Sequence, residues 1–225
     1  YQLSVISSPE DFLNETKVKN FSYEFLKDAP NNASLEGFLF PDTYFVPKDI
    51  TAHDLIDLML TNFDKKFDGQ LREDLQKQNL NIFEAIVFAS IVEREAKKEE
   101  DRPLVGGILV KRQKNGWPLE ADATVQYAVT GQLVTTNHQP PTANQLDWWP
   151  QELTKEDLQI DSPYNTRKFT GLPPGPIANP GLASIKAVVY PKESEYWYYV
   201  SDEAGNIYYS QTFEEHQAKI AKYVR

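Results

Sequence analysis

The chain has 225 residues, no cysteine and a formal net charge of −10. Hydrophobic residues at 40% and charged residues at 25% are ordinary for a globular protein. The lack of cysteine excludes disulfides, thiolate metal sites and a cysteine nucleophile. A negative chain without a cluster of Lys and Arg is not expected to bind nucleic acid. No stretch reaches the ~18 apolar residues of a membrane-spanning helix.

The first third of the chain predicts short helices and strands. Residues 1–34 have the pattern of a helical lead-in. Residues 35–47 are rich in aromatic side chains and are interrupted by a proline–aspartate pair, which predicts a strand, a turn and a second short strand. Thr51 and Asp54 form a capping box, so a helix is expected to follow.

The most apolar stretch is residues 82–92, whose apolar side chains surround the whole helix and predict that it is buried. One face of this helix is expected to carry Ile86, Ser90, Glu93 and Lys97. At the inner end of a buried helix the Glu93 carboxylate loses hydration, which favours its protonated form and suits it to proton transfer. The alternative is that Glu93 begins a solvated tail and pairs with Lys97.

The next part of the chain predicts helices separated by a loop. A helix opens at Arg102, which precedes a proline, and ends at Asn115, which precedes a glycine. Asp122 is placed to cap a short helix over residues 124–129. Residues 130–150 are polar and contain proline, so we expect a surface loop there.

The last third predicts an irregular segment followed by regular structure. Residues 161–181 contain five prolines and three glycines and are expected to be irregular. Asn179 is expected to cap a helix over residues 181–189. Two aromatic strands around residues 202–205 predict a β-hairpin. The final helix is expected to turn Phe213, Ile220 and Tyr223 inward. Helices with scattered short strands indicate the α+β class.

Several chemistries are excluded by missing motifs. The chain has no G-x-S-x-G elbow, S-x-x-K, H-E-x-x-H, P-loop or G-x-G-x-x-G sequence. Its three histidines are His53, His138 and His216, which lie in a first helical turn, a loop and the last helix. None of them suggests a catalytic or metal-binding histidine. We therefore expect no metal and no organic cofactor.

The remaining carboxylate, amide, hydroxyl and aromatic side chains suit a glycan site, where an acid protonates the leaving oxygen of a glycosidic bond. A lytic transglycosylase needs one such acid, and Glu93 is expected to be it. A hydrolase would need a second carboxylate, for which Asp122 and Glu95 are candidates. Without such a role, Asp42 is a turn residue, Asp122 a helix cap and Glu95 a solvated or ion-paired side chain. The residues expected to line the cleft are Glu36, Asp42, Tyr44, Ser90, Asp122, Thr124, Tyr164 and Asn165.

Four strings in this order resemble the YceG-like family of MltG-type endolytic murein transglycosylases. They are LEGFLFPDTY (35–44), ASIVEREA (89–96), PLEADATVQY (118–127) and DSPYNT with GLPPGPIANPGLASIKAV (161–188). The resemblance runs from about residue 35 to the C-terminus. It implies a catalytic domain over residues 35–225, preceded by a lead-in over residues 1–34 that is linked to, or left over from, a LysM-like module.

The resemblance implies an extracytoplasmic enzyme anchored in the bacterial cell membrane. Such enzymes cut nascent peptidoglycan strands between N-acetylmuramic acid and N-acetylglucosamine, beside the synthases, and leave 1,6-anhydro ends. The family's acid/base falls on Glu93, the residue that the helix pattern also selects. A non-catalytic peptidoglycan-binding scaffold is the remaining alternative. The anchor would lie outside this chain, which looks like the catalytic part of a longer protein.

The chain departs from the family pattern at three places. Ala123 replaces a proline, Arg167 replaces a tyrosine, and the insert at residues 130–150 is longer than the minimal version. These departures are expected to affect contacts with the glycan and to leave Glu93 unchanged.

Overall fold

The computed structural model describes residues 9–137, 149–150 and 152–224. Its helices and strands confirm the α+β class. The elements are α1 (Pro9–Glu15), η1 (Val18–Asn20), η2 (Glu24–Leu26), α2 (Ala52–Lys66), α3 (Gly69–Gln76), α4 (Ile82–Glu95), α5 (Arg102–Lys114), α6 (Asp122–Asn137), η3 (Asp157–Gln159), α7 (Leu182–Val189), β1 (Tyr198–Ser201), β2 (Ile207–Ser210) and α8 (Phe213–Tyr223).

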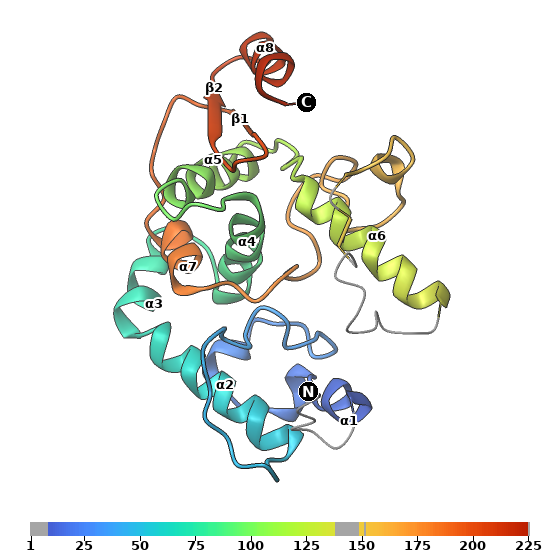
Figure 1. Ribbon diagram of the computed structural model, residues 1–225. Helices are drawn as coiled ribbons and strands as arrows, with labels where there is room; N and C mark the ends of the chain where they lie inside the picture. Colours follow the sequence, from blue (N-terminus) through green and yellow to red (C-terminus); the bar gives the residue numbers. More distant parts are fainter. Residues whose placement is uncertain (1–8, 138–148, 151, 225) are drawn as a thin grey trace.

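Helix α4 is at the centre of the molecule, and α3, α5, α6 and α7 pack against it (Figure 1). It begins with a capping box between Asn81 and Glu84, and every residue from Ala85 to Val92 is buried. This confirms the predicted buried helix. Because its apolar side chains point in all directions, α4 can bury surface against several neighbours at once.

The packing of α5 on α7 depends on a glycine. A Cβ atom at Gly106 would lie 2.7 Å from the carbonyl oxygen of Ala187. Only glycine lets the two backbones approach so closely. Helices α5 and α7 therefore pack closely against each other.

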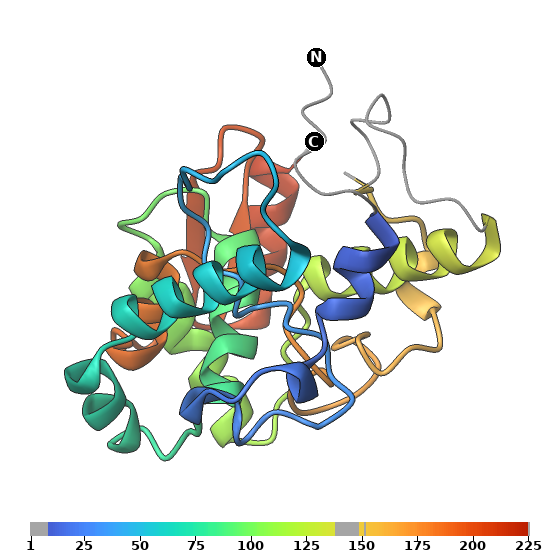
Figure 2. The same ribbon diagram turned by 90° about the horizontal axis from the view of Figure 1, so that it is seen from below.

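An aromatic cluster joins the N-terminal elements to the core. Phe25 lies 4.7 Å from Phe63 and 5.8 Å from Phe38 between ring centroids, and all three rings are fully buried. Thr51 caps α2 by accepting a hydrogen bond from the Asp54 amide, as predicted. In Figure 2, seen from below, α1 lies beside α2. The lead-in thus shares a hydrophobic core with the rest of the chain.

The strands predicted for residues 35–47 are wrong, because the described chain has no ladder partner for this segment. The amides of Gly37 and Leu39 donate instead to the side-chain oxygen of Asn179. Gly37 has a φ of +92°, which breaks extended backbone. The segment is an irregular loop in which Phe38 and Phe40 belong to the core, whereas Phe45 is 96% exposed.

The predicted C-terminal hairpin is confirmed. Strands β1 and β2 pair antiparallel, with Tyr198 opposite Ser210, and α8 packs beside them (Figure 1). The expected inward face of α8 is wrong in two of three positions, since Phe213 is 52% exposed and Ile220 is 39% exposed. Tyr223 does pack, because it stacks on Tyr208 at 3.6 Å.

Two helices differ from expectation. Helix α3, capped by the Asp68 side chain, was not predicted. Helix α6 begins at Asp122 and runs to Asn137, so the predicted short helix is longer than expected and the loop prediction is wrong for residues 130–137. The rest of that loop includes residues 138–148, which lie outside the described residues. No helix in the described ranges is long and apolar enough to cross a membrane.

Candidate active site

Glu93 lies where α4 reaches the surface, and its side chain is 26% exposed. Nη2 of Arg102, the first residue of α5, donates to its Oε1 at 3.1 Å. The backbone amide of Gly181, at the start of α7, donates to its Oε2 at 3.0 Å. Both oxygens are thus held by donors from other elements of the protein.

The surroundings of Glu93 differ from both sequence-based readings. The carboxylate is neither fully buried nor paired with Lys97, whose ammonium donates to the carbonyl of Glu203. The partner Arg102 was predicted only as a helix start. A cation at a helix N-terminus is electrostatically unfavourable, so its position could have indicated a nearby anion.

The predicted face of α4 is covered by the proline-rich segment, residues 161–181. Pro176 lies near Ile86, since both would contact a Cβ at Gly37. One turn along, Ser90 Oγ donates to the Val87 carbonyl and accepts from the Ile177 amide at 3.0 Å. The segment then reaches Glu93 through Gly181. The shared face is confirmed for Ile86, Ser90 and Glu93, but α4 ends at Glu95, so Lys97 is not part of it. The proline-rich segment follows this face to the carboxylate.

Asn179 ties this segment to residues 35–40. Its Oδ1 accepts from the amides of Gly37 at 2.7 Å and Leu39 at 3.2 Å. The expected cap by Asn179 is therefore wrong, and Gly181 is the N-cap of α7. One amide side chain satisfies two backbone donors of a loop that has no strand partner.

Glu36 and Tyr164, predicted together in the cleft, do meet through Tyr127. The Tyr127 hydroxyl donates to Glu36 Oε2 at 2.5 Å, and its ring lies 4.8 Å from that of Tyr164. Burial raises the pKa of Glu36, while the bond from Tyr127 opposes this rise. Burial and the nearby Glu36 raise the pKa of Tyr127, which stays a donor at neutral pH. This half-buried group joins residues 35–40, α6 and the proline-rich segment.

Three predicted ligand contacts are corrected. Ser90, Thr124 and Asn165 are each 0% exposed, so they cannot touch a ligand in this structure. Thr124 Oγ1 bonds with Thr166 Oγ1 at 2.9 Å, and Asn165 Nδ2 donates to the carbonyls of Leu158 and Ile160. These side chains hold the loops that form the site.

Asp122, Asp42 and Tyr44 remain accessible. Asp122 is 55% exposed and accepts from the guanidinium of Arg167, one of the departures from the family pattern. Asp42 and Tyr44 form a separate cluster, in which Asn62 of α2 donates to both at 3.0 Å. No contact among the described residues joins that cluster directly to Glu93.

Glu95 is not the solvated side chain that its position on the helix suggested. Its Oε1 accepts from the amide of Ala123 at 3.2 Å, and its carboxyl also bonds to the Tyr199 side chain. Burial, helped by the negative charge of Asp122, raises the pKa of Glu95 to about 7. The four strings that carry the resemblance therefore meet in one hydrogen-bonded network around the end of α4.

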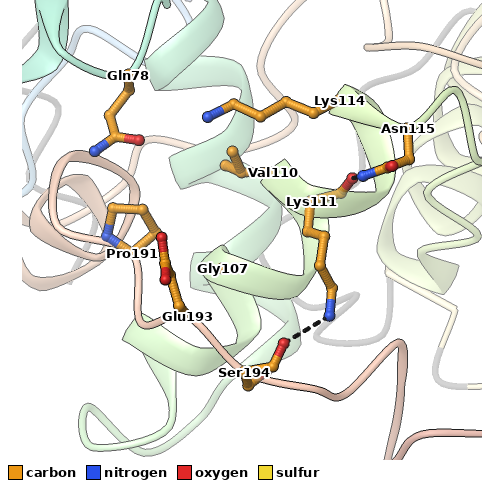
Figure 3. Close-up of a pocket in the computed structure, with 9 residues that line it drawn as sticks. All are labelled: Gln78, Gly107, Val110, Lys111, Lys114, Asn115, Pro191, Glu193 and Ser194. Carbon is orange, nitrogen blue, oxygen red and sulfur yellow. Dashed lines mark hydrogen bonds between the residues drawn. The ribbon is translucent and has the colours of Figure 1, made fainter.

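A pocket of about 300 Å³ lies elsewhere, between α5 and the segment after α7 (Figure 3). Lys111 crosses its edge and donates to the Ser194 carbonyl at 2.9 Å. None of the predicted site residues lines it. Within the described ranges, no three His, Cys, Asp or Glu side chains could together hold a metal ion.

Comparisons with known proteins bear on the family of this chain. The family model "YceG-like family" matches residues 4–222. The chain is 32% identical over 219 residues to a Bacillus subtilis (strain 168) protein named endolytic murein transglycosylase. This match covers 96% of this chain and 56% of that protein. A protein of the same name from Streptococcus pneumoniae (strain D39) is 33% identical over 202 residues, which are 88% of this chain and 34% of that protein.

A crystal structure of a YceG-like protein from Listeria monocytogenes has the same fold, with a TM-score of 0.71 and 32% identity. The match covers 96% of this chain and 66% of that chain. The chain thus spans about half, or less, of the length of the named relatives. With a family model that matches nearly every residue, this chain belongs to the YceG-like family.

Proposed function

We propose that this chain is the catalytic part of an endolytic lytic transglycosylase with Glu93 as its single general acid/base. It would cut peptidoglycan strands between N-acetylmuramic acid and N-acetylglucosamine and leave 1,6-anhydro ends. The observation that carries the proposal is the Glu93 carboxylate, which is accessible and is held by Arg102 and Gly181 where the family strings meet. The relatives named endolytic murein transglycosylase support the reaction class.

The acid step requires protonated Glu93. A bound strand would cover the exposed part of the side chain and exclude water from it. Glu93 then gives its proton to the 4-oxygen of the leaving N-acetylglucosamine as the C1–O4 bond breaks, and positive charge develops at C1 of the muramic acid. The bond from Arg102 stabilises the carboxylate that results.

The base step uses the same carboxylate. The 6-hydroxyl of the muramic acid attacks C1, and Glu93 accepts the hydroxyl proton as the C1–O6 bond forms. The acid is thereby regenerated and no water is consumed. The Gly181 amide and the Arg102 guanidinium fix the direction of both oxygens, so that one side chain can serve both steps. No step needs a metal or an organic cofactor.

The accessible side chains supply the proposed glycan contacts. Glu36 and Tyr164 would contact the strand near α6, and Asp122 from the first turn of that helix. Asp42 and Tyr44 would contact it further away, beside α2. We place the reaction at the cell wall, outside the cytoplasmic membrane, beside strand-polymerising synthases. Membrane anchoring and these partners rest on the family resemblance alone.

The experiment compares the parent chain with Glu93→Gln on uncrosslinked glycan strands, with product ends identified by mass spectrometry. Glu99→Gln is the matched control, because it removes the same charge from an exposed turn close to α4. We expect 1,6-anhydro ends from the parent and the control, and none from Glu93→Gln. Hydrated reducing ends would refute the transglycosylase in favour of a hydrolase. Binding that survives Glu93→Gln, with no cleavage by any variant, would favour the scaffold.

A further inference from the structure

One carboxylate joins three elements beside the proposed acid. Glu95 is the last residue of α4, two positions after Glu93. It accepts a hydrogen bond from Ala123, the second residue of α6, and bonds to Tyr199 of β1. In Figure 1, α6 lies beside α4 and extends outward from it. Glu95 is thus a direct side-chain link between α4 and the first turn of α6.

Helix α6 carries three side chains that bond to segments near Glu93, and we call these bonded groups the wall of the site. Tyr127 holds Glu36, Thr124 holds Thr166, and Asp122 pairs with Arg167. A displacement of the first turn of α6 would therefore move side chains on two other segments. Because proton transfer depends on placement to within about 1 Å, such a displacement would reduce the rate without touching Glu93.

We propose that Glu95 is a positioning residue, which fixes the first turn of α6, and the wall that α6 carries, against the end of α4 that bears Glu93. The proposal rests on the transglycosylase function proposed above. Glu95 is not placed as the acid, because the proposed function already assigns that role to Glu93.

The hydrogen bonds that the Glu95 carboxyl makes depend on its charge. Ionised, it accepts from both the Ala123 amide and the Tyr199 hydroxyl. Protonated, it has an O–H that must itself donate, so one of these bonds is lost or reverses. Burial and Asp122 raise its pKa to about 7, against the opposing effects of the Ala123 amide, Tyr199 and Arg167. Arg94, next to it on α4, also interacts with its charge.

The sign of the pH effect follows from these contacts. Above pH 7 the ionised carboxylate holds both donors and the wall is fixed. As the pH falls through about 7, one bond weakens and the rate should fall with it. Glu95→Gln keeps an oxygen for Ala123 and cannot titrate. We expect it to lower kcat about tenfold and to remove this limb of the pH profile.

The test has two readouts on the intact chain. The first is the pH profile of anhydro-end formation by the parent, Glu95→Gln and the exposed control Glu99→Gln. The second is an NMR titration of the Glu95 carboxyl and the Ala123 amide, which does not depend on activity. We expect both signals to share a midpoint near pH 7. In Tyr199→Phe the midpoint should rise, because a donor that favours the ionised form is lost.

The possible results separate the proposals. A folded Glu95→Gln that is as inactive as Glu93→Gln would make Glu95 catalytic and overturn the positioning role. A Glu95→Gln variant with the parent's rate and the parent's loss of rate at acid pH would also overturn the positioning role. So would an active parent in which the NMR signal of the Ala123 amide does not change as Glu95 titrates. A parent that makes no anhydro ends would refute the transglycosylase itself, and this proposal with it.

Discussion

Gly37 offers a test of how closely the 35–40 loop must approach α4. A Cβ at this position would lie 2.5 Å from Cγ of Pro176 and 2.8 Å from Cγ2 of Ile86. Neither neighbour can move aside easily, because one is a ring and the other is a fully buried core side chain. Gly37 also has a φ of +92°. Gly37→Ala should therefore combine backbone strain of about 1–2 kcal/mol with overpacking of about 1–3 kcal/mol.

The matched control is Gly171→Ala. Gly171 has nearly the same φ, +91°, but a Cβ there would meet nothing within 4 Å. The control should lose only the strain, so the free energy of unfolding should differ between the two variants by about 1–3 kcal/mol. Urea denaturation of both variants and the parent measures this difference. Equal losses would refute the close approach. We also expect only Gly37→Ala to impair cleavage, since Gly37 bonds to the segment that leads to the acid.

Three further variants test the network. Asn179→Ala leaves two backbone amides of residues 35–40 without their acceptor, and should destabilise the chain by about 1–3 kcal/mol in urea unfolding; an unchanged midpoint would contradict the bonds. Tyr127→Phe removes a donor to the Glu36 carboxylate, so the pKa of Glu36 should rise further in an NMR titration. The raised pKa of Glu95, about 7 against 4.5, means that its ionisation costs stability as the pH rises from 4.5 through 7. Glu95→Gln should therefore gain about 2–3 kcal/mol over the parent between pH 5 and pH 8, and no relative gain would refute the burial of that charge.

Local signals predicted the elements well where short-range chemistry decides them. Thr51 caps α2, the buried α4 follows from apolar residues on all sides, and the turn at residues 202–205 closes the hairpin. Each depends on residues within a few positions of one another. The register of Ser90 and Glu93 on one face of α4 was predictable for the same reason, since helical geometry fixes it.

Long-range contacts account for the errors. The strands predicted at residues 35–47 fail because Asn179, some 140 positions away, takes the amides that a ladder would use. The polar composition of residues 130–150 hid the last turns of α6. Phe213 and Ile220 have helical spacing typical of a core face, yet α8 packs only beside the hairpin and leaves them exposed.

The sequence predicted only part of the site, because long-range packing decides which polar side chains are buried. Residue type and order selected Glu93 and brought Glu36 together with Tyr164, but they could not separate residues that touch a ligand from residues that hold a loop. Ser90 and Asn165 have polar side chains suited to sugar binding, and only the fold determines that they are buried. The role of Glu95 depends on a hydrogen bond from a backbone amide of α6, and no spacing pattern in the sequence predicts that bond.

A polar residue near the site can therefore be necessary in two ways, by touching the glycan or by holding a loop. A buried hydroxyl or amide costs about 1–3 kcal/mol unless it is paired, so the fully buried Ser90, Thr124 and Asn165 are stable only in the bonded arrangement, and the half-buried Asn179 is stabilised by its bonds. Each bonds to a segment far away in the sequence, or holds the turn of such a segment. Residues 35–40 and the proline-rich segment, residues 161–181, are thus expected to order cooperatively. Loss of activity on replacing one of these side chains would be evidence about the placement of the acid, and not about contact with the glycan.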